Sequence, residues 1–467
     1  MSFGAFPQRV LLVTGEPIGE RLAGPAIRVW HMAEALAAEG HAVTVASTGG
    51  VARHSEHFAG ADFHGAHAEE LVDASDIVVF QGSFYATMPW LAAKPQVQVM
   101  DLYDPFHIEY LQSDQGSDVA ERERRIRELT VELNAQLGRA DLVLCATERQ
   151  RDLWLGHLGS IGRLRPSRAT GHETDGAIDE LVRIVPFGLP DEPFRPDAVL
   201  PTGSRAIRTP ERSIGEDDVV LLWAGGIYDW FDPLTLIRAV EAAHPRAPSL
   251  KLFFLSSVHP NSAVAAHSRA HQAVELAREL GIEGTLVHFN DRWVPYDERS
   301  AYLADADAGV TTHTAGLETR FSFRTRNLDY LWAGLPIVTS DGDSFADLVR
   351  DRGVGVVVPP GDVEALADAL VALVADAESR SEWAAHSIES ASAFRWSETL
   401  RPLLAFVADP HRSSIDVASA QPASSEKPGV GHDLRTAIRH LRAGGLALFM
   451  TRLANRRRRN ALRRGGS

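Results

Sequence analysis

Residues 316–343 place a group of charged side chains directly before the pattern of a helix and a buried strand. Leu328, Leu331 and Trp332 are spaced as one apolar face of a helix, and a short strand is predicted at Ile337–Ser340, after an Ala-Gly-Leu-Pro turn. A glycine turn that links an amphipathic helix to a buried strand is a feature of layered α/β folds. This stretch therefore favours an α/β fold.

The charged start of the same stretch has the features of a diphosphate site. Free backbone amides and the helix dipole attract anions at the start of a helix, and Ser322 or Thr325 can cap such amides. Arginine side chains bind phosphate oxygens with two hydrogen bonds at once. Asp329, one turn into the helix, is placed to accept hydrogen bonds from hydroxyl groups attached to the diphosphate. The arginines of the stretch are Arg320, Arg324 and Arg326.

This stretch resembles the donor-binding segment of the family 4 glycosyltransferases, retaining enzymes of the two-domain GT-B fold. That segment has two glutamates eight residues apart, followed by a small-x-Gly-x-Pro-hydrophobic turn. Here Asp329 stands in the second acidic position, five residues before Gly334, whereas Phe321 stands in the first. The nearest carboxylate is Glu318, so the resemblance makes Glu318 a candidate catalytic residue in a variant motif.

Length and composition favour two cytoplasmic domains. A chain of 467 residues exceeds one ordinary domain, and its apolar content suffices for two cores. The formal net charge of -15 argues against a general nucleic-acid binder. Cys145 is the only cysteine, which excludes an internal disulfide framework and fits a reducing cytosol. Because the N-terminus has no charged-then-apolar leader and no window approaches about 18 uninterrupted apolar residues, we expect a cytoplasmic protein.

The N-terminal region has the pattern of a βαβ unit. Arg9–Thr14 is a continuous apolar run typical of a buried parallel strand, and a helix over residues 25–39 and a strand over 42–46 are predicted to follow. The loop after the first strand lacks Gly-x-Gly-x-x-Gly, so a nicotinamide or flavin site has no support. In the glycosyltransferase family a comparable glycine loop faces the cleft, so the resemblance makes Gly24 and Arg28 candidate acceptor-side or phosphate contacts.

Two further predicted strands, at residues 76–81 and 96–101, lead to a polar loop. Ligands of open α/β sheets bind at the carboxyl ends of strands, so the loop after the second strand is a candidate site. The resemblance implies catalytic roles for Asp104 and His107 and an acceptor-side role for Glu109. On the residues alone, an Asp-Pro turn is commonplace, and a lone histidine is more often structural than catalytic.

The first domain is expected to end at residue 188. An exposed amphipathic helix is predicted over residues 117–138 and another strand over 141–146. The segment 183–196 is dense in proline and glycine, which is typical of a linker between domains. Within it, Val-Pro-Phe-Gly at 185–188 resembles the hinge strand of the glycosyltransferase family.

The second domain is predicted to begin with the buried strand Val219–Trp223 and a glycine loop. Gly225 and Gly226 let the backbone approach a phosphate, and the next helix points its N-terminus the same way. The family has an arginine and a lysine in this loop, but this chain has neither between Gly225 and Pro233. We therefore expect Arg320, Arg324 or Arg326 to neutralise the diphosphate from the other side of the site.

Further strands of the second domain are predicted, and one of them leads to a candidate base-binding loop. That loop resembles the family segment that holds the nucleotide base. Trp293 within it either stacks on the base or covers an edge of the core. The predicted strands cover residues 250–255, 286–289, 310–312 and 353–360, and a helix is predicted at Val363–Ala375.

The C-terminal segment of the chain has a positive net charge, whereas the rest of the chain is negative. Between His432 and Ser467 ten arginines accompany one acidic residue, so this segment carries +9 and the remainder -24. A basic amphipathic helix of this type binds the surface of an anionic membrane. The alternatives are a basic tail without a specific role and a tail that folds on the acidic body.

Five regions are therefore expected along the chain. They are an N-terminal Rossmann-like acceptor-side domain (1–188), a C-terminal Rossmann-like nucleotide-sugar-binding domain (189–385), a helix that crosses back to the first domain (386–408, from a helical pattern over 381–407), a flexible linker rich in serine, alanine and proline (409–432) and a basic amphipathic tail (433–467).

The resemblance implies a cytoplasmic, metal-independent, retaining hexosyltransferase-type enzyme with two Rossmann-like domains that face each other across a cleft. It implies a nucleoside-diphosphate-sugar donor, no cofactor and no nucleic-acid partner. With the basic tail, it suggests a glycan or lipid-linked acceptor in cell-envelope polysaccharide or glycolipid synthesis, at the inner face of the plasma membrane. The alternatives are a GT-B epimerase or phosphorylase and a non-catalytic sugar-nucleotide-binding scaffold, because fold alone does not determine the reaction. Donor turnover distinguishes the scaffold from the enzyme.

Overall fold

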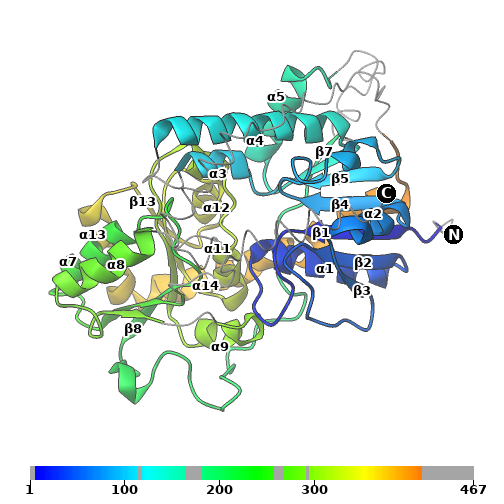
Figure 1. Ribbon diagram of the computed structural model, residues 1–467. Coiled ribbons are helices and arrows are strands. Elements are labelled where there is room, and N and C mark those ends of the chain that lie inside the picture. The colour runs from blue at the N-terminus through cyan, green and yellow to red at the C-terminus, as the bar shows by residue number, and fades with distance from the viewer. Residues whose placement is uncertain (1–5, 113–117, 165–180, 257–267, 291–293, 413–467) are drawn as a thin grey trace, which may run out of the picture. The chain divides into compact units, whose positions relative to one another are not determined.

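The computed structural model describes residues 6–112, 118–164, 181–256, 268–290 and 294–412. Within these ranges the chain forms two parallel sheets, each covered by helices on both faces (Figure 1). Strands buried on both faces are what the continuous apolar runs predict, and the fold-class prediction is confirmed. Trp293 and the chain beyond residue 412, which includes the expected tail and most of the expected linker, lie outside the described residues.

The first sheet has seven parallel strands in the order β3-β2-β1-β4-β5-β6-β7. The strand order reverses beside β1, and ligands of such sheets bind at the carboxyl ends of the strands next to that point. The strands are β1 (Arg9–Thr14), β2 (Ala42–Ser47), β3 (Ala59–Asp62), β4 (Ile77–Gln81), β5 (Val97–Asp101), β6 (Leu142–Cys145) and β7 (Val182–Ile184).

Alternate residues of the first sheet enter two different cores. In β1, Val10 and Leu12 belong to the core that contains α1 (Gly24–Ala38), whereas Leu11 and Val13 belong to the core on the opposite face. That opposite face is covered by α2 (Gly65–Asp73), α4 (Val119–Arg139) and α5 (Glu148–Ser160). The short helix α3 (Phe106–Gln112) follows β5 and contacts α4. The exposed amphipathic helix predicted near residues 117–138 is confirmed as α4.

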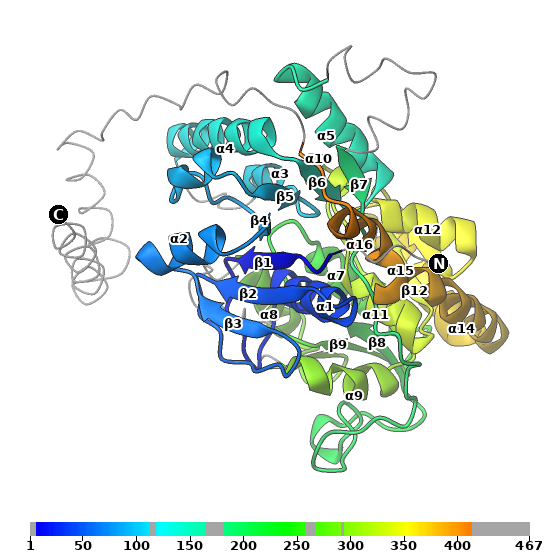
Figure 2. The same cartoon turned by 90° about the vertical axis from the view of Figure 1, so that its right-hand side faces the viewer.

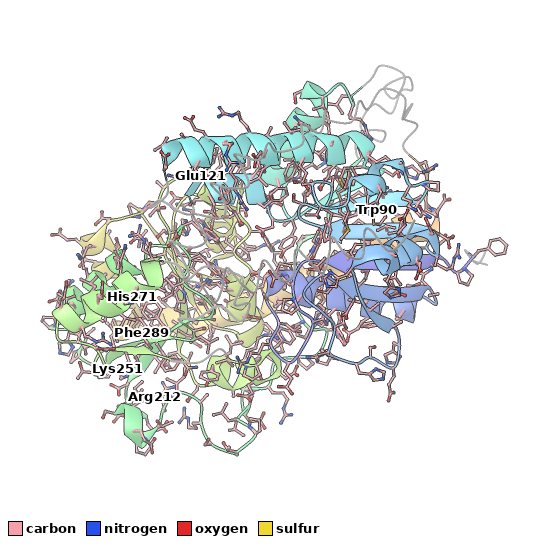
Figure 3. The ribbon with its side chains drawn as sticks, viewed as in Figure 1. Trp90, Glu121, Arg212, Lys251, His271 and Phe289 are labelled. Atoms are coloured by element: carbon pink, nitrogen blue, oxygen red, sulfur yellow. The ribbon has the colours of Figure 1, made fainter. Side chains whose placement is uncertain are left out.

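The second sheet has six parallel strands in the order β10-β9-β8-β11-β12-β13, again with a reversal beside its first strand in the chain. Lys251 and Phe289 mark β9 and the edge strand β10 in Figure 3. The strands are β8 (Val219–Trp223), β9 (Leu250–Phe254), β10 (Val287–Phe289), β11 (Ala308–Thr311), β12 (Ile337–Ser340) and β13 (Gly355–Val358).

Helices cover both faces of the second sheet (Figure 1). One face carries α7 (Pro233–Ala243), α8 (Ser268–Glu279) and α13 (Val363–Ala375). The other carries α9 (Arg299–Ala304), α11 (Arg326–Ala333) and α12 (Ser344–Arg352), whose apolar side chains continue into the core around α1. The short helix α10 (Leu317–Phe321) precedes α11 and contacts α3 and α5.

The C-terminal helical segment is broken, and the prediction of one continuous helix over 381–407 is wrong. It consists of α14 (Ala377–Ala391), a 3₁₀ turn (Ser392–Phe394), α15 (Trp396–Thr399) and α16 (Arg401–Ala408). Arg395 is extended, with φ −61° and ψ 146°, because the backbone there pairs with Leu189: the Leu189 amide donates to Phe394 and the Trp396 amide donates to Leu189. The segment then reaches the first sheet, where α16 lies beside β7 and Arg183 donates to the Pro402 carbonyl at 2.8 Å (Figure 2). No helix in the described part of the chain is both long and apolar enough to span a membrane.

Candidate functional site

A cavity of about 170 Å³ is lined by residues that follow strands of both sheets. The first sheet contributes Leu22, Gly24 and Ile27 from the β1–α1 connection and Phe187 and Gly188 from the segment after β7. The second sheet contributes the glycine loop after β8, the 3₁₀ turn before α9, and the start of α11. The lining includes six of the residues that the sequence predicts for the site: Gly24, Gly225, Gly226, Thr325, Arg326 and Asp329.

The glycine loop after β8 depends on glycine at two adjacent positions. Gly225 has φ 136°, which side-chain-bearing residues rarely adopt. A Cβ atom at Gly226 would lie 3.1 Å from the Tyr228 ring, which is tighter than an ordinary contact. A side chain at either position would therefore strain the loop or its contact with Tyr228.

Tyr330 holds α11 on the second sheet. Its hydroxyl donates to the carbonyls of Leu222 or Val310, at 2.9 and 3.0 Å, and accepts from the Ala224 amide at 2.8 Å. Gly309 of β11 makes room for the ring, since a Cβ atom there would lie 2.2 Å from it. This anchor sets the orientation of the residues on either side of Tyr330 in the sequence.

Arg326, the first residue of α11, presents a buried guanidinium group to the cavity. Its Nη2 donates to the Gly226 carbonyl at 2.7 Å, but its Nη1 has no hydrogen-bond partner within the described ranges. Among the described residues no carboxylate forms an ion pair with it, and the group instead lies over the rings of Trp223 and Phe231, at 4.7 and 4.2 Å. Burial lowers the pKa of Arg326 to about 10, so the group stays charged at neutral pH.

The helix start itself offers fewer free groups than expected. Thr325 is the N-cap of α11, but its side chain makes no capping hydrogen bond, and the Ser322 hydroxyl donates to the Thr319 carbonyl instead. The amides of Asn327 and Leu328 already donate to carbonyls three residues earlier. The capping prediction for Ser322 and Thr325 is therefore corrected, and the positive charge of this wall comes mainly from Arg326.

Asp329 lies one turn further along α11 and also lines the cavity. Its Oδ1 accepts from Arg299 Nε at 3.2 Å. Burial raises the pKa of Asp329, and the neighbouring Arg299 lowers it in part. The sequence gives no signal for Arg299, because 30 residues separate it from Asp329 and no spacing pattern connects residues on two different helices.

Arg324 is not in the cavity wall, because buried carboxylates already occupy it. Its two terminal nitrogens bind both oxygens of Glu318 at 2.8 Å, and its Nε lies 3.5 Å from Asp343 Oδ2. All three side chains are almost fully buried. Burial raises the pKa of Asp343 to about 6. Arg320 is exposed and lies along the Phe321 ring. Of the three arginines predicted to neutralise a diphosphate, Arg326 lines the cavity, whereas Arg320 and Arg324 do not.

The loop after β5 separates its three predicted site residues. Asp104 and Glu109 share a hydrogen bond, and burial, followed by the charge of Asp104, raises the pKa of Glu109 well above its usual range. His107 instead lies against Trp154 of α5, with ring centroids 5.6 Å apart, and burial lowers its pKa to about 4. The structure therefore does not bring His107 to the cavity, and at neutral pH its ring is uncharged.

Arg28 is a structural residue, which corrects its predicted acceptor-side role. Its guanidinium group binds both oxygens of Asp101 at 2.7 and 2.9 Å and donates to the carbonyls of Val185 and Pro186. It is entirely buried and does not line the cavity. Gly24 does line it, four residues earlier. The described ranges contain no cluster of three or more histidine, cysteine, aspartate or glutamate side chains arranged to hold a metal ion.

Comparison with solved structures identifies the fold. The structure of WaaG, a glycosyltransferase of lipopolysaccharide biosynthesis, aligns with a TM-score of 0.59 at 18% identity and covers 85% of this chain and 99% of WaaG. Anabaena HepE, solved in complex with UDP and glucose, aligns with a TM-score of 0.59 at 14% identity, over 86% of this chain and all of that one. At these identities the likeness concerns the fold.

Sequence comparison identifies relatives of part of the chain. A D-inositol 3-phosphate glycosyltransferase of Saccharomonospora viridis is 29% identical over 232 residues, 49% of this chain and 50% of that protein. The corresponding protein of Kribbella flavida is 30% identical over 234 residues, 49% of this chain and 51% of its own length. A phosphatidyl-myo-inositol mannosyltransferase of Mycobacterium leprae is 42% identical over 99 residues, 21% of this chain and 25% of that protein.

The first two of these matches span about half the length of the relatives concerned. Residues 218–376, which contain every strand of the second sheet and both Arg326 and Asp329, match the family described as "Glycosyl transferases group 1". Over these residues the chain is similar to the group 1 glycosyltransferases, and the fold of the described chain is the GT-B fold of WaaG.

Proposed function

We propose that this protein is a retaining, metal-independent glycosyltransferase that transfers a sugar from a nucleoside-diphosphate-sugar to a glycan or lipid-linked acceptor. One observation carries the proposal: the buried guanidinium group of Arg326 faces the cavity with no carboxylate partner among the described residues. A buried charge is costly unless another group neutralises it. A bound diphosphate supplies that charge, with donors from Arg326 and from the glycine loop around it.

The neighbouring groups suit the other parts of such a donor. Asp329 is a carboxylate at the cavity wall and is proposed to accept hydrogen bonds from the two ribose hydroxyls. Gly225 and Gly226 let the phosphates approach the backbone. Asp104, Glu109 and Glu318 stay candidates for the acceptor side and the reacting sugar.

The chemistry needs stabilisation of a leaving group more than a protein nucleophile. Departure of the nucleoside diphosphate leaves an oxocarbenium-like sugar. Arg326 stabilises the negative charge that develops on the departing phosphate, because its charge is already in place and screened from water. The acceptor hydroxyl then attacks the face that the phosphate has left, and a diphosphate oxygen takes its proton. The configuration at the anomeric carbon is retained.

The relatives support the substrate classes. Two are named for D-inositol 3-phosphate and one for phosphatidyl-myo-inositol, and the HepE structure contains UDP and glucose. An acceptor of the cell envelope, either a polysaccharide or a glycolipid, is proposed on this basis. The finer identity of sugar, base and linkage follows from assays.

A binding experiment tests the proposed donor site. Calorimetry compares UDP, GDP and ADP with the corresponding nucleosides, on the wild type, on Arg326→Gln and on the matched control Arg320→Gln, whose side chain is exposed. Loss of one charge-assisted contact predicts a fall of about 10- to 100-fold in nucleoside diphosphate affinity for Arg326→Gln, with nucleoside affinity unchanged. The control is expected to bind like the wild type. Equal losses for both ligands, or wild-type affinity in Arg326→Gln, would contradict the proposal.

A non-catalytic sugar-nucleotide-binding scaffold is the second candidate. It is favoured by Phe321 in the place of the first motif glutamate and by the pairing of Glu318 with Arg324, which occupies both oxygens of the nearest carboxylate. Release of nucleoside diphosphate across a panel of donors and acceptors separates the two. A protein that binds the diphosphate through Arg326 but turns over no donor is the scaffold.

The basic tail, residues 433–467, is proposed to bind anionic membranes at the cytoplasmic face. The basis is its sequence alone: ten arginines interspersed with apolar residues. Vesicle co-sedimentation compares the full chain with a chain that ends at Gly431, on anionic and on neutral lipids. Binding of the full chain to anionic vesicles that salt weakens but does not abolish is expected. Equal sedimentation of the full and the shortened chain would exclude the tail as an anchor.

A further inference from the structure

Arg299 lies beside Asp329 and over two aromatic rings. Its guanidinium carbon lies 3.7 Å from the centre of the Tyr296 ring and 5.4 Å from that of Trp332. Its Nε donates to Asp329 at 3.2 Å, and its Nη1 donates to the Tyr296 carbonyl at 3.4 Å. A guanidinium held flat on a ring keeps its donors in one direction, which an ammonium group on a flexible stem does not. The position of the Asp329 carboxylate therefore depends on Tyr296.

Tyr296 is in turn tied to the first half of the chain. Its hydroxyl lies 3.2 Å from His31 Nε2, on α1, 265 positions away in the sequence. The His31 ring stacks on Trp396 of α15, with centroids 4.9 Å apart and planes 24° apart. The Tyr296 side chain, whose ring lies under Arg299, is therefore hydrogen-bonded to α1, a helix that packs on the first sheet.

The two ring nitrogens of His31 have different partners, which assigns their roles. Nδ1 lies 2.8 Å from Glu34 Oε2, and Glu34 Oε1 accepts from Trp30 Nε1 at 2.8 Å. A carboxylate only accepts hydrogen bonds, so Nδ1 carries the proton. In the uncharged ring Nε2 then accepts from the Tyr296 hydroxyl.

We propose that Arg299, Tyr296 and His31 are positioning residues that orient Asp329 toward the donor ribose, so that ribose recognition by the second half depends on its contact with the first. This inference rests on the proposed function, because it takes Asp329 as the ribose contact. It adds that the Asp329 carboxylate recognises the ribose only when these residues hold it in position. When α1 and the turn that carries Tyr296 separate, the Tyr296 hydroxyl loses its hydrogen bond to His31. The ribose contact of Asp329 then weakens, while the Arg326 site stays intact.

The test measures ribose recognition directly. UDP, GDP and ADP are compared with their 2′,3′-dideoxy forms, and the ratio of the two affinities reports the contribution of the ribose hydroxyls. Arg299→Lys keeps the charge but loses the planar stack, and it should reduce this ratio by about tenfold. Tyr296→Phe keeps the ring and removes only the hydroxyl, and His31→Phe keeps the stack on Trp396. Each should reduce the ratio by about threefold, and the double variant should lose no more than either single one, because both remove the same hydrogen bond.

A second contact between the halves provides the control. Arg53 lies 3.5 Å from Asp297, the neighbour of Tyr296, and Asp297 does not line the cavity. Asp297→Asn breaks this contact and should leave the affinity ratio unchanged. If Tyr296→Phe and His31→Phe weaken ribo and dideoxy ligands alike, or if neither changes the ratio, the positioning role is excluded while the donor site stands. Failure of the wild type to bind any of the diphosphates would instead overturn the proposed function itself and this inference with it.

Discussion

Arg324 and Arg326 are two positions apart, and both guanidinium groups lie over the ring of Phe231, at 4.8 and 4.2 Å. Their surroundings nevertheless differ completely. Arg324 binds both oxygens of Glu318 and lies near Asp343, whereas Arg326 meets aromatic rings and one backbone carbonyl. Within the described part of the chain, carboxylates therefore balance the charge of Arg324 but not that of Arg326.

This contrast shows what distinguishes a structural arginine from a binding one. When a buried arginine has carboxylate partners, removing either the arginine or the carboxylates destabilises the protein, because the remaining charge is buried without a partner. A buried arginine without carboxylate partners destabilises the folded protein by its unpaired charge, and a negatively charged ligand reduces this destabilisation when it binds. Burial alone does not separate the two roles, since both residues are less than a tenth exposed. The partner does.

The largest expected effect is on stability, from Arg324→Met. The change leaves Glu318 and Asp343 buried without their cation, and it should lower the free energy of unfolding by about 3–5 kcal/mol. Arg326→Met removes a buried cation that has no carboxylate partner in the described chain, and it should leave that free energy unchanged or raise it. Chemical denaturation of both variants measures the difference. Similar losses in the two variants would erase the distinction between the two arginines.

A smaller effect is expected from pH, through Asp343. Its pKa is about 6 in the folded protein, raised by burial from an ordinary value of 3.8. Between these two values the folded state binds the proton more strongly, so the contribution of Asp343 to stability is complete below about pH 4 and is lost as the pH rises to about 6. The shift corresponds to a loss of about 3 kcal/mol.

Asp343→Asn isolates this contribution. Asparagine cannot ionise, but it can still cap α12, where Asp343 accepts from the Ala346 amide at 2.7 Å. The free energy of unfolding of the variant, measured by denaturation from pH 4 to pH 7, should decline less than that of the wild type. Parallel curves for the two proteins would show that Asp343 ionises normally.

The smallest effect is on ligand binding, from Asp329→Asn. Replacing the carboxylate should weaken nucleoside diphosphate binding by about 1–3 kcal/mol, because the ribose hydroxyls lose a charged acceptor. Asp343→Asn, in the cluster with Arg324, should bind the same ligands like the wild type. Calorimetry at one pH compares the two. Unchanged affinity in Asp329→Asn would remove Asp329 from the donor site.

The sequence was sufficient for the features that depend on local patterns. Continuous apolar runs predict β1 and β8, because a strand buried on both faces is apolar along most of its length. The turn that ends α11 requires Gly334, whose φ is 68°, and the sequence shows this directly. The prediction of a continuous C-terminal helix was wrong because of a contact that is distant in the sequence. The backbone around Arg395 pairs with Leu189, and no local pattern records a partner so far away.

The candidate site divides in the same way. The sequence by itself indicated which stretches line the cavity, since Gly225, Gly226, Arg326 and Asp329 stand beside a predicted strand end and a predicted helix start. Only the tertiary structure decided which arginine lacks a carboxylate partner among the described residues, because ion pairing depends on distances between side chains that folding brings together. It also placed Arg299 and His31 next to the site, and it directed His107 and Arg28 into the interior. A sequence specifies its local conformations residue by residue, whereas the balance of a buried charge is a property of everything that surrounds it.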